Sequence, residues 1–274
     1  MTSAGNFDIS SDRILVMGVL NVTPDSFYEG SRSTSAARAI EAGLGMVAAG
    51  ADILDIGGES SRPGAEPVSA EFEIDRILPV VRGLRSESDV PISVDTTKAR
   101  VASAALEEGV TWINDISALR FDPEMASVIA NAGAGAILMH MRGTPLTMQQ
   151  APRYVDVVHD VREFLLSRAD VAIEAGIPQD RIILDPGIGF GKTLDHNLAL
   201  LRGLSILCDS GYPVLVGLSR KSFLGAILDV PAEERLEGTI AANTVAILHG
   251  ASIIRVHDVK EGRRTADVAV RLRS

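Results

Sequence analysis

Polar side chains that can recognise a small ligand recur at the ends of short apolar runs in this sequence. Asp95, Asn114 and Asp185 each end such a run. Two carboxylates and an amide can accept hydrogen bonds from N–H groups and donate to a carbonyl. This set suits a flat, nitrogen-rich heterocycle with amide-like edges. Mg²⁺ is the alternative ligand, because it also prefers carboxylate and amide oxygens.

A hydrophobic wall beside these groups would favour the heterocycle over the metal. Met139 lies at the end of another apolar run, next to His140, and Phe190 follows Asp185 by five residues. Both are placed to provide such a wall. Asn21 and Asp55 end two further apolar runs near the N-terminus, so nearly every run closes on a polar group.

Cationic groups follow the last two apolar runs. Ser219-Arg220-Lys221-Ser222 lies where a helix is expected to begin, and the free N–H groups of a helix N-terminus attract anions. Arg255 and His257 are two residues apart, so they point the same way on an extended chain. The pattern predicts an anion site after these two runs.

Eight short, β-branched runs must position all of these groups, and an amphipathic helical pattern follows each. Unalternating apolar strands are typical of a parallel sheet that is buried on both faces. Eight strand–helix units in 274 residues match a (β/α)₈ (TIM) barrel, in which the chemistry lies where strands end. The expected strands are 13–20, 52–56, 92–94, 111–113, 136–140, 181–184, 214–216 and 252–256.

An open, doubly wound sheet is the competing architecture, but it would concentrate polar groups near one switch point. We therefore expect a single barrel domain over residues 13–274 after a polar tail of residues 1–12. The same patterns place a helix over 36–49 and another over 233–249. Ser69 and Asp122 are expected N-caps, the latter for a helix that begins at Pro123.

Composition narrows the class of partner. With 36 acidic and 26 basic side chains the net charge is −10, which argues against a nucleic-acid binder. The N-terminal residues have no signal-peptide pattern, and no apolar run reaches the ~20 residues of a membrane helix. A cytoplasmic protein without membrane contact is expected. Cys208 is the one cysteine and is expected to be an inert packing residue.

Two apparent motifs fail on inspection. Residues 187–193, GIGFGKT, resemble nucleotide-binding loops, but Pro186 replaces the first Walker A glycine and Lys192 replaces the last dinucleotide glycine. The five histidines show no zinc-binding spacing.

Seven segments, in order along the chain, resemble the dihydropteroate synthase family of pterin-binding barrels. Two of them, NVTPDSF and GGESSRPG, are highly specific to that family. The segments are MGVLNVTPDSF (17–27), DIGGESSRPGA (55–65), SVDTTK (93–98), INDIS (113–117), LDPGIGFGK (184–192), GLSRKSFLG (217–225) and IRVHDV (254–259).

The resemblance implies an activity: joining 6-hydroxymethyl-7,8-dihydropterin pyrophosphate to 4-aminobenzoate, with Mg²⁺ and in a homodimer. It implies three groups of site residues. The pterin would be held by Asp95, Asn114, Asp185 and Lys221, with Met139 and Gly217 lining its slot. The pyrophosphate would be held by Arg255, His257 and Asn21, the last also near Mg²⁺. The aminobenzoate would be framed by Phe27, Phe190, Lys221 and Ser222, under a loop that carries Ser61, Arg62 and Pro63.

The first loop departs from the family pattern, because Tyr28-Glu29 replaces the usual Ser-Asp after Phe27. Glu29 keeps the negative charge expected near the cationic centre, on a longer arm. Two rival functions are a methyltetrahydrofolate-dependent methyltransferase and a non-catalytic pterin-binding paralogue. A methyltransferase would not need the cations near Lys221 and Arg255, and a paralogue would be expected to lose groups from the first two loops. A generic phosphosugar barrel leaves the acidic and amide groups unexplained.

Overall fold

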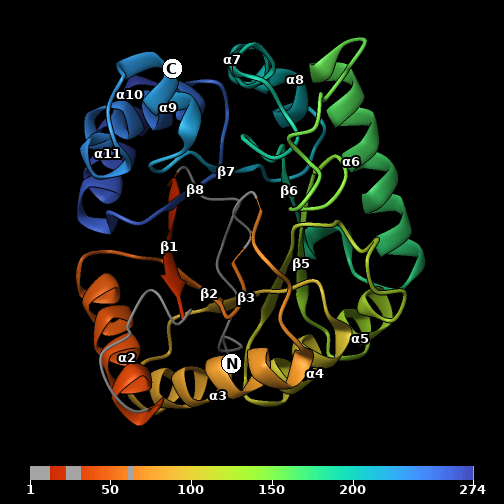
Figure 1. Ribbon diagram of the computed structural model, residues 1–274, viewed down its shortest axis with the longest axis vertical. Coiled ribbons are helices and arrows are strands. Elements are labelled where there is room, and N and C mark those ends of the chain that lie inside the picture. Colours follow the sequence, from red (N-terminus) through yellow and green to blue (C-terminus); the bar gives the residue numbers. More distant parts are fainter. Residues whose placement is uncertain (1–12, 23–31, 61–63, 274) are drawn as a thin grey trace.

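The computed structural model describes residues 13–22, 32–60 and 64–273, apart from the side chains of residues 32–34. In these ranges eight strands pair in parallel in the order β6-β5-β4-β3-β2-β1-β8-β7, and a bridge between Leu184 and Val214 joins β6 to β7. The result is a closed barrel, as predicted, and not an open sheet (Figure 1). The strands are β1 (Leu15–Asn21), β2 (Ile53–Gly57), β3 (Ile92–Asp95), β4 (Trp112–Asp115), β5 (Gly135–Met139), β6 (Ile182–Asp185), β7 (Leu215–Gly217) and β8 (Ile253–Val256).

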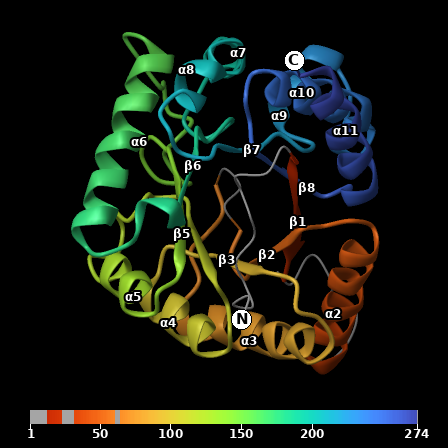
Figure 2. The same ribbon diagram turned by 180° about the vertical axis from the view of Figure 1, so that it is seen from behind.

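Helices form a ring around the strands, which both views show (Figures 1 and 2). Each β-strand is followed by at least one helix, so every crossover returns the chain to the same end of the barrel. The helices are α2 (Arg32–Ala48), α3 (Ala70–Glu87), α4 (Ala99–Glu107), α5 (Met125–Asn131), α6 (Val157–Glu174), α7 (Leu194–Arg202), α8 (Leu204–Cys208), α9 (Ser222–Leu228), α10 (Leu236–Leu248) and α11 (Val259–Leu272).

The predicted strands are confirmed, with ends that differ by no more than two residues. Ser69 caps α3 as expected, since its hydroxyl accepts the N–H of Phe72. The helix after Asp122, α5, begins at Met125 and not at the expected Pro123. The carboxylate of Asp122 accepts the N–H of Glu124 at 3.0 Å, in the turn that leads into α5, as an N-cap does. It also accepts the N–H of Ala99 at 2.8 Å, so it caps the start of the preceding helix, α4, as well.

The helix expected over 233–249 is also shorter than predicted. A 3-10 turn occupies Ala232–Glu234, and α10 begins only at Leu236. Gly250 ends the segment with a φ of 106°, a left-handed conformation that favours glycine. The predicted division into a tail of 1–12 and a domain stays a prediction, because the tail lies outside the described residues.

Apolar side chains fill the inside of the barrel and the space between strands and helices. One buried cluster joins strands to helices, and a second, smaller cluster lies inside the barrel. Seven of the eight strands supply the inner cluster, so it closes the interior like a floor. Its members are Leu15, Met17, Ile53, Trp112, Ile137, Ile183, Leu215 and Ile253.

A second layer of inward side chains lies directly above this floor. Side chains two residues apart on a strand point to the same face, so the residue two places after each floor residue also faces inward. In order along the chain these are Val19, Asp55, Asn114, Met139, Asp185, Gly217 and Arg255, and on β3 Asp95 follows the buried Ser93 by the same two residues. The strand period of two therefore places the polar groups on one level, at the carboxyl ends of the strands.

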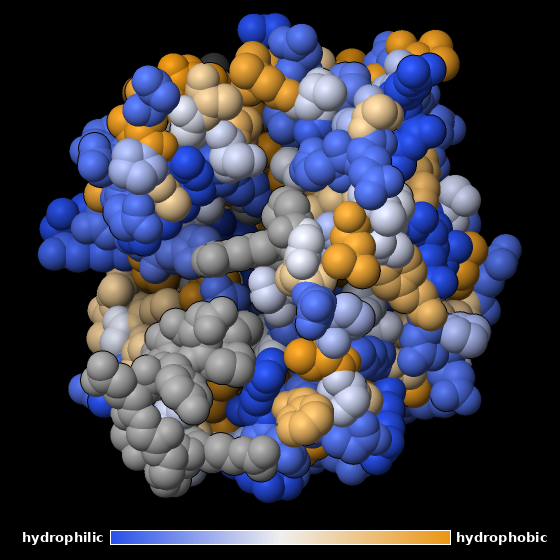
Figure 3. Space-filling model, in the orientation of Figure 1, coloured by the Kyte–Doolittle hydropathy of each residue, from blue (hydrophilic) through white to orange (hydrophobic). Residues whose placement is uncertain are grey.

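On the face seen in Figure 3, hydrophobic residues are scattered among a larger number of hydrophilic ones. Among the described residues, no helix is long and apolar enough to cross a membrane.

Substitutions at two glycines test the packing, because they are expected to change the free energy of unfolding in opposite directions. A methyl group on Gly135 would overlap the ring of Trp112 in the barrel floor, whereas one on Gly45, in helix α2, would meet nothing within 4 Å. We expect Gly135→Ala to lower the free energy of unfolding by about 1–3 kcal/mol through overpacking. Gly45→Ala should raise it by about 0.5–1 kcal/mol through helix propensity.

Urea unfolding followed by fluorescence measures both variants, because Trp112 is the single tryptophan of the chain. A Gly135→Ala protein as stable as the original would contradict the packing around Trp112.

Candidate active site

The centre of the second layer is an ion-pair network around Arg255. Its Nε donates to Asp55 Oδ2 at 2.6 Å, and its Nη2 donates to Asp95 Oδ2 at 3.0 Å. The amide Nδ2 of Asn114 donates to the same Asp55 oxygen at 3.1 Å. Four strands, β8, β2, β3 and β4, are thus joined through one guanidinium, two carboxylates and one amide.

This network has buried acceptors with no protein partner. Asn114 Oδ1 and Asp55 Oδ1 are buried, and neither accepts a hydrogen bond from the part of the chain that the structure describes. A buried polar atom without a partner costs about 1–3 kcal/mol. The arrangement is therefore complete only when water or a ligand donates hydrogen bonds to it. This is the behaviour expected of a binding site rather than of a structural ion pair.

Burial changes the protonation of the carboxyls in this layer. It raises the pKa of Asp95 to about 7, against the opposing effect of Arg255, and the neighbouring charge of Asp55 adds to the rise. Burial likewise raises the pKa of Asp185, which Lys221 and a hydrogen bond from the Gly187 N–H partly offset. At neutral pH Asp95 can therefore either accept a proton from a ligand or donate one to it.

Lys221, at the N-cap position of α9, places a cation near Asp185. Its ammonium donates to the carbonyl of Ile188 and lies 4.9 Å from the centre of the Phe190 ring. Burial lowers its pKa to about 8, although Asp185 acts in the other direction. Loss of the proton above that pH would remove a charge from the site.

The expected hydrophobic wall is present. Met139 packs with Ile116, Met141 and Met148 in one buried cluster, and half-buried Phe190 packs against it. Gly217 leaves room beside this wall. A methyl group there would come within 3.8 Å of both Lys221 Nζ and Arg255 Cβ, so a side chain would fill space between the two cations.

The groups predicted as an anion site are divided between the interior and the rim. Arg255 is bound by two carboxylates inside the barrel, whereas His257 is exposed and its Nδ1 lies 3.0 Å from Ser219 Oγ. Ser222 is the exposed first residue of α9. Arg220 forms a two-bond ion pair with Asp258, at 3.0 and 2.5 Å, which fixes the turn before α9.

Five predicted site residues lie outside the described residues: Phe27, Glu29, Ser61, Arg62 and Pro63. Asn21 is described, and it ends β1 with its side chain beside the end of β2. Its Oδ1 lies 3.7 Å from the position that a Cβ on Gly57 would occupy. Asn21 therefore reaches the same rim as the other strand-end groups.

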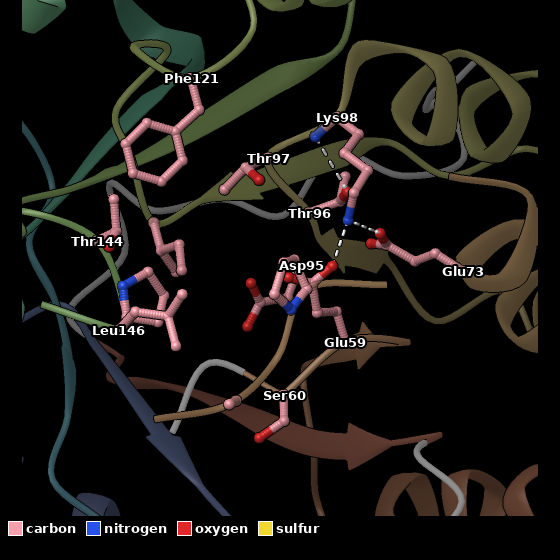
Figure 4. A pocket seen from close by; sticks show the side chains of 14 residues that line it. Glu59, Ser60, Glu73, Asp95, Thr96, Thr97, Lys98, Phe121, Thr144 and Leu146 are labelled. Atoms are coloured by element: carbon pink, nitrogen blue, oxygen red, sulfur yellow. Dashed lines mark hydrogen bonds and ion pairs between the residues drawn. The ribbon is translucent and has the colours of Figure 1, made fainter. Parts of the chain in front are cut away.

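A cavity of about 260 Å³ opens next to Asp95 (Figure 4). One side is apolar and includes Phe121 and Leu146, while Glu59, Glu73 and Lys98 form a charged cluster on the other. Within the described residues, no group of three or more His, Cys, Asp or Glu side chains could hold a metal ion.

The sequence analysis missed two structural roles near the site. Lys192, in the segment that imitates nucleotide loops, is buried and donates to the carbonyls of Gly187 and Phe190 at 2.9 and 3.0 Å. Its Nζ also lies 2.9 Å from Nδ1 of His140, whose pKa is lowered to about 2, chiefly by burial. His140 is thus a neutral partner of Lys192 and holds the loop that carries Phe190. The sequence signal for this role is a single lysine within the glycine-rich segment 187–193.

Together, the fold and this site define a (β/α)₈-barrel enzyme that binds a flat, hydrogen-bonding heterocycle at the carboxyl ends of its strands. Residues 17–257 match the family model described as pterin binding enzyme. A dihydropteroate synthase from Synechocystis is 49% identical over 94% of this chain and 89% of its own.

Two solved structures from Xanthomonas albilineans are also similar. The dihydropteroate synthase with 4-aminobenzoic acid has a TM-score of 0.90 at 43% identity, covering 96% of this chain and 94% of its own. The one in complex with 7,8-dihydropteroate has a TM-score of 0.87 at 39% identity, covering 98% and 96%. The chain belongs to the dihydropteroate synthase family, and the relatives' names favour the synthase over the methyltransferase alternative.

Asp185→Asn tests whether the carboxylate binds ligand or only supports the fold. Asparagine keeps an oxygen for the Gly187 N–H but replaces the second acceptor with an NH₂ donor. We expect pterin binding to weaken by about 1–3 kcal/mol and the melting temperature to change little. Calorimetric titration with 6-hydroxymethylpterin and a thermal melt measure the two effects. A protein that unfolds while its remaining folded fraction binds normally would show that the role is structural.

Lys221→Met tests the cost of a buried cation in the site. The folded-state pKa, about 8, is below the ordinary lysine value of ~10.4. The folded state is therefore destabilised by the charge below pH 8, and this effect fades as the pH rises from 8 towards 10. We expect the variant to be more stable than the original at pH 7, with a shrinking advantage up to pH 10. Urea titrations at several pH values measure it, and a pH-independent difference would contradict the prediction.

Proposed function

We propose that this protein is a dihydropteroate synthase, which condenses 6-hydroxymethyl-7,8-dihydropterin pyrophosphate with 4-aminobenzoate. The observation that carries the proposal is the polar layer above the barrel floor, with its unpartnered buried acceptors at Asn114 and Asp55. The similarity to the dihydropteroate synthases, over more than nine-tenths of the chain, supports it.

The pterin lies in the second layer in this proposal. Its N–H and NH₂ groups donate to Asp95, Asn114 and Asp185, while Lys221 donates to its ring oxygen or nitrogen. Met139 lies against the ring, and Gly217 leaves space for it. The raised pKa of Asp95, about 7, lets this side chain match either an acceptor or a donor on the ring edge.

The reaction forms one C–N bond and breaks one C–O bond. The amine nitrogen of aminobenzoate attacks the CH₂ attached to the pterin, the pyrophosphate leaves with the bonding electrons, and the nitrogen then loses a proton to solvent. A neutral arylamine is already nucleophilic, so the site needs no general base. Positive charge that develops on the ring is offset by Asp95 and Asp185, and preorganised charges of this kind are a large source of rate enhancement.

The leaving pyrophosphate is stabilised at the rim. Arg255 shares its remaining donors with it, and His257 and the first N–H groups beyond Lys221 lie on the same side. Because Arg255 is held by Asp55 and Asp95, its guanidinium is fixed before the substrate binds.

Mg²⁺ fits this rim through a single protein ligand. Asp55 Oδ2 and Asp95 Oδ2 bind Arg255, and Asp55 Oδ1 is buried, whereas the amide oxygen of Asn21 lies at the strand ends beside Gly57. Mg²⁺ commonly keeps several waters and binds substrate phosphates with one or two protein oxygens. When bound, it would neutralise charge on the pyrophosphate.

The aminobenzoate binds near the start of α9. Phe190 and Lys221 provide a ring contact and a cation, and Ser222 offers its backbone N–H to the carboxylate. From the family resemblance, Phe27 and Glu29 of the first loop and Ser61, Arg62 and Pro63 of the second close over this substrate.

The direct test follows pyrophosphate release. The purified protein is incubated with the pterin pyrophosphate, 4-aminobenzoate and Mg²⁺, and dihydropteroate is identified by mass. We expect release that depends on the amine and is lost on chelation of Mg²⁺. Asp185→Asn serves as the matched low-activity variant. Absence of release with both substrates, while pterin still binds, would contradict the synthase and favour a non-catalytic pterin binder.

We also propose that the protein is a cytoplasmic homodimer that contacts its partner through α9, α10 and α11. These helices expose large apolar residues. The outer face of a solvated helix is usually polar, whereas that of α10 exposes Val245 and Leu248. The monomer has a mass of 29.0 kDa, and sedimentation should give twice that mass. Val245→Glu should shift the measured mass towards that of the monomer. The exposed apolar residues are Ile227, Leu228, Val245, Leu248, Val268 and Leu272.

A further inference from the structure

Lys192 is a buried cation to which the proposed chemistry gives no role. It is 3% exposed and lies in the segment 187–193, which only imitates a nucleotide-binding loop. Its Nζ faces the carbonyls of Gly187, Phe190 and His140 at 2.9, 3.0 and 3.3 Å, and Nδ1 of His140 at 2.9 Å. An ammonium has three donors and no acceptor. These four partners can all accept, so they fit the charged form even though burial lowers the pKa of this lysine.

The first two of these carbonyls belong to opposite ends of one tight turn. The N–H of Phe190 donates to the Gly187 carbonyl at 3.0 Å and closes the turn, and Gly189 lies within it at a φ of 86°, which favours glycine. A Cβ on Gly187 would overlap the carbonyl oxygen of His140, so the turn packs directly against the residue that follows β5. Lys192 therefore holds both ends of the turn and attaches them to the end of β5.

The same turn forms a wall against Lys221. The ammonium of Lys221 donates to the carbonyl of Ile188 and lies 4.9 Å from the centre of the Phe190 ring. Both groups come from the turn, whereas Lys221 itself comes from the N-cap position of α9. A Cβ on Gly189 would lie 3.4 Å from Lys221 Cδ, so the backbone of the turn is also close to this side chain. A shift of the turn would change the surroundings of the ammonium.

Two further bonds hold the middle of the turn but not its ends. The N–H of Gly189 donates to Asn197 Oδ1 on α7, and the carbonyl of Gly189 accepts from Gln149, both at 2.7 Å. The peptide group that follows Phe190 is different, because its carbonyl accepts from the ammonium of Lys192. The direction in which the Phe190 ring leaves the backbone therefore depends on the lysine.

We infer that Lys192 is a positioning residue, which sets the binding of the arylamine by holding the turn 187–190 against Lys221. It acts through the turn and not by contact with the substrate. Without it, the Phe190 carbonyl and His140 Nδ1 lose a donor, and the turn shifts towards other donors or water. The inference rests on the proposed function for the identity of the arylamine, whose ring contact and cation are Phe190 and Lys221.

The pterin should depend on Lys192 much less than the arylamine does. Asp95 and Asn114 lie on β3 and β4 and bond within the ion-pair network inside the barrel. Asp185 accepts the first N–H of the turn, but it ends β6 and is placed by the strand. Lys221 is shared by the two substrates, so a small effect on the pterin is expected. A loss much larger for the arylamine separates positioning from a general loss of structure.

A ring-current shift tests the position of the turn in the substrate-free protein. The chain has four lysines, Lys98, Lys192, Lys221 and Lys260, so lysine labelled with ¹³C at Cε gives few side-chain signals. The Phe190 ring should displace the Cε–H signal of Lys221, and Phe190→Leu assigns that displacement. We expect Lys192→Met to lose most of it. An unchanged Lys221 signal in Lys192→Met would overturn the inference.

The kinetics of Lys192→Met test the consequence for the substrate. We expect kcat/KM for 4-aminobenzoate to fall about 10- to 100-fold, the loss typical of a displaced substrate-positioning group. The Kd for 6-hydroxymethylpterin should rise no more than about threefold, the effect of one weakened hydrogen bond. Losses of equal size for the two substrates, or an unchanged kcat/KM, would contradict the assigned role.

Arg85→Met is the matched control for the loss of a cation that binds loop carbonyls. The partly buried guanidinium of Arg85 donates to the carbonyls of Val90 and Gly109 at 2.5 and 3.1 Å, before β3 and β4, at the amino end of the barrel. The variant should have a lower melting temperature but keep the Lys221 signal, kcat/KM and Kd. If its kcat/KM for 4-aminobenzoate falls as far as that of Lys192→Met, the effect is one of general stability and the inference fails.

A pair of variants at His140 covers the case in which Lys192→Met does not fold. Asparagine can place Oδ1 near the position of Nδ1 and accept the bond from the lysine, whereas leucine, of similar size, cannot. Both variants remove the imidazole ring and its contact with Phe164, at 4.8 Å between ring centres, so their difference isolates the hydrogen bond. We expect His140→Leu to lose part of the Lys221 displacement and of kcat/KM, and His140→Asn to retain both. Equal behaviour of the two variants would sink the inference.

The lysine signals separate this inference from the proposed function. If the original protein releases no pyrophosphate, the proposed function fails, while the Lys221 signal still shows whether Lys192 holds the turn. An original protein that is active, with a Lys221 signal that does not respond to Lys192→Met or to His140→Leu, overturns the inference and leaves the proposed function intact.

Discussion

The site depends on one constraint, the charge of Arg255 held between Asp55 and Asp95 inside the barrel. Asp55 is fully buried, so its charge has to be compensated from within the protein. Arg255 supplies that compensation and, in doing so, joins β8 to β2 and β3, while Asn114 adds β4. The hydrogen-bonding groups that a ligand must meet are therefore held in place before the ligand arrives. This lowers the entropic cost of binding.

The position of this network follows from the layer beneath it. The floor of apolar side chains excludes water from below. On β2, β4, β6 and β8 the residue two places further along the strand is polar and lies above this floor. Burial is the main reason that the pKa of Asp95 rises to about 7 and that of Lys221 falls to about 8. The protein accepts unpartnered acceptors and a destabilised lysine here, as expected where binding is favoured over stability.

Two lysines, one buried and one partly buried, attach loops to the barrel. Lys192 holds the segment with Phe190 by three carbonyl and imidazole contacts, and Lys98 holds the segment after β2 through Glu59. Lys192 lies within the loop it holds and bonds to the residue after β5, whereas Lys98 reaches from the start of α4 to the segment after β2. The hydrophobic effect shapes the barrel, whereas charged hydrogen bonds place the loops above it.

The sequence by itself determined the eight strand–helix units, the parallel barrel and the identity of most strand-end groups, because hydrophobic periodicity and turn residues are local signals. It did not determine which groups meet. The pairing of Arg255 with Asp55 spans 200 residues, and that of Lys98 with Glu59 spans 39. Asp122 shows the same limit. A local pattern indicated its bond to the turn before α5, whereas its second bond, to the first residue of α4, joins residues 23 apart in the sequence. Only the closed barrel decides such partners, because closure brings distant strand ends within hydrogen-bond distance and burial then requires each charge to be paired.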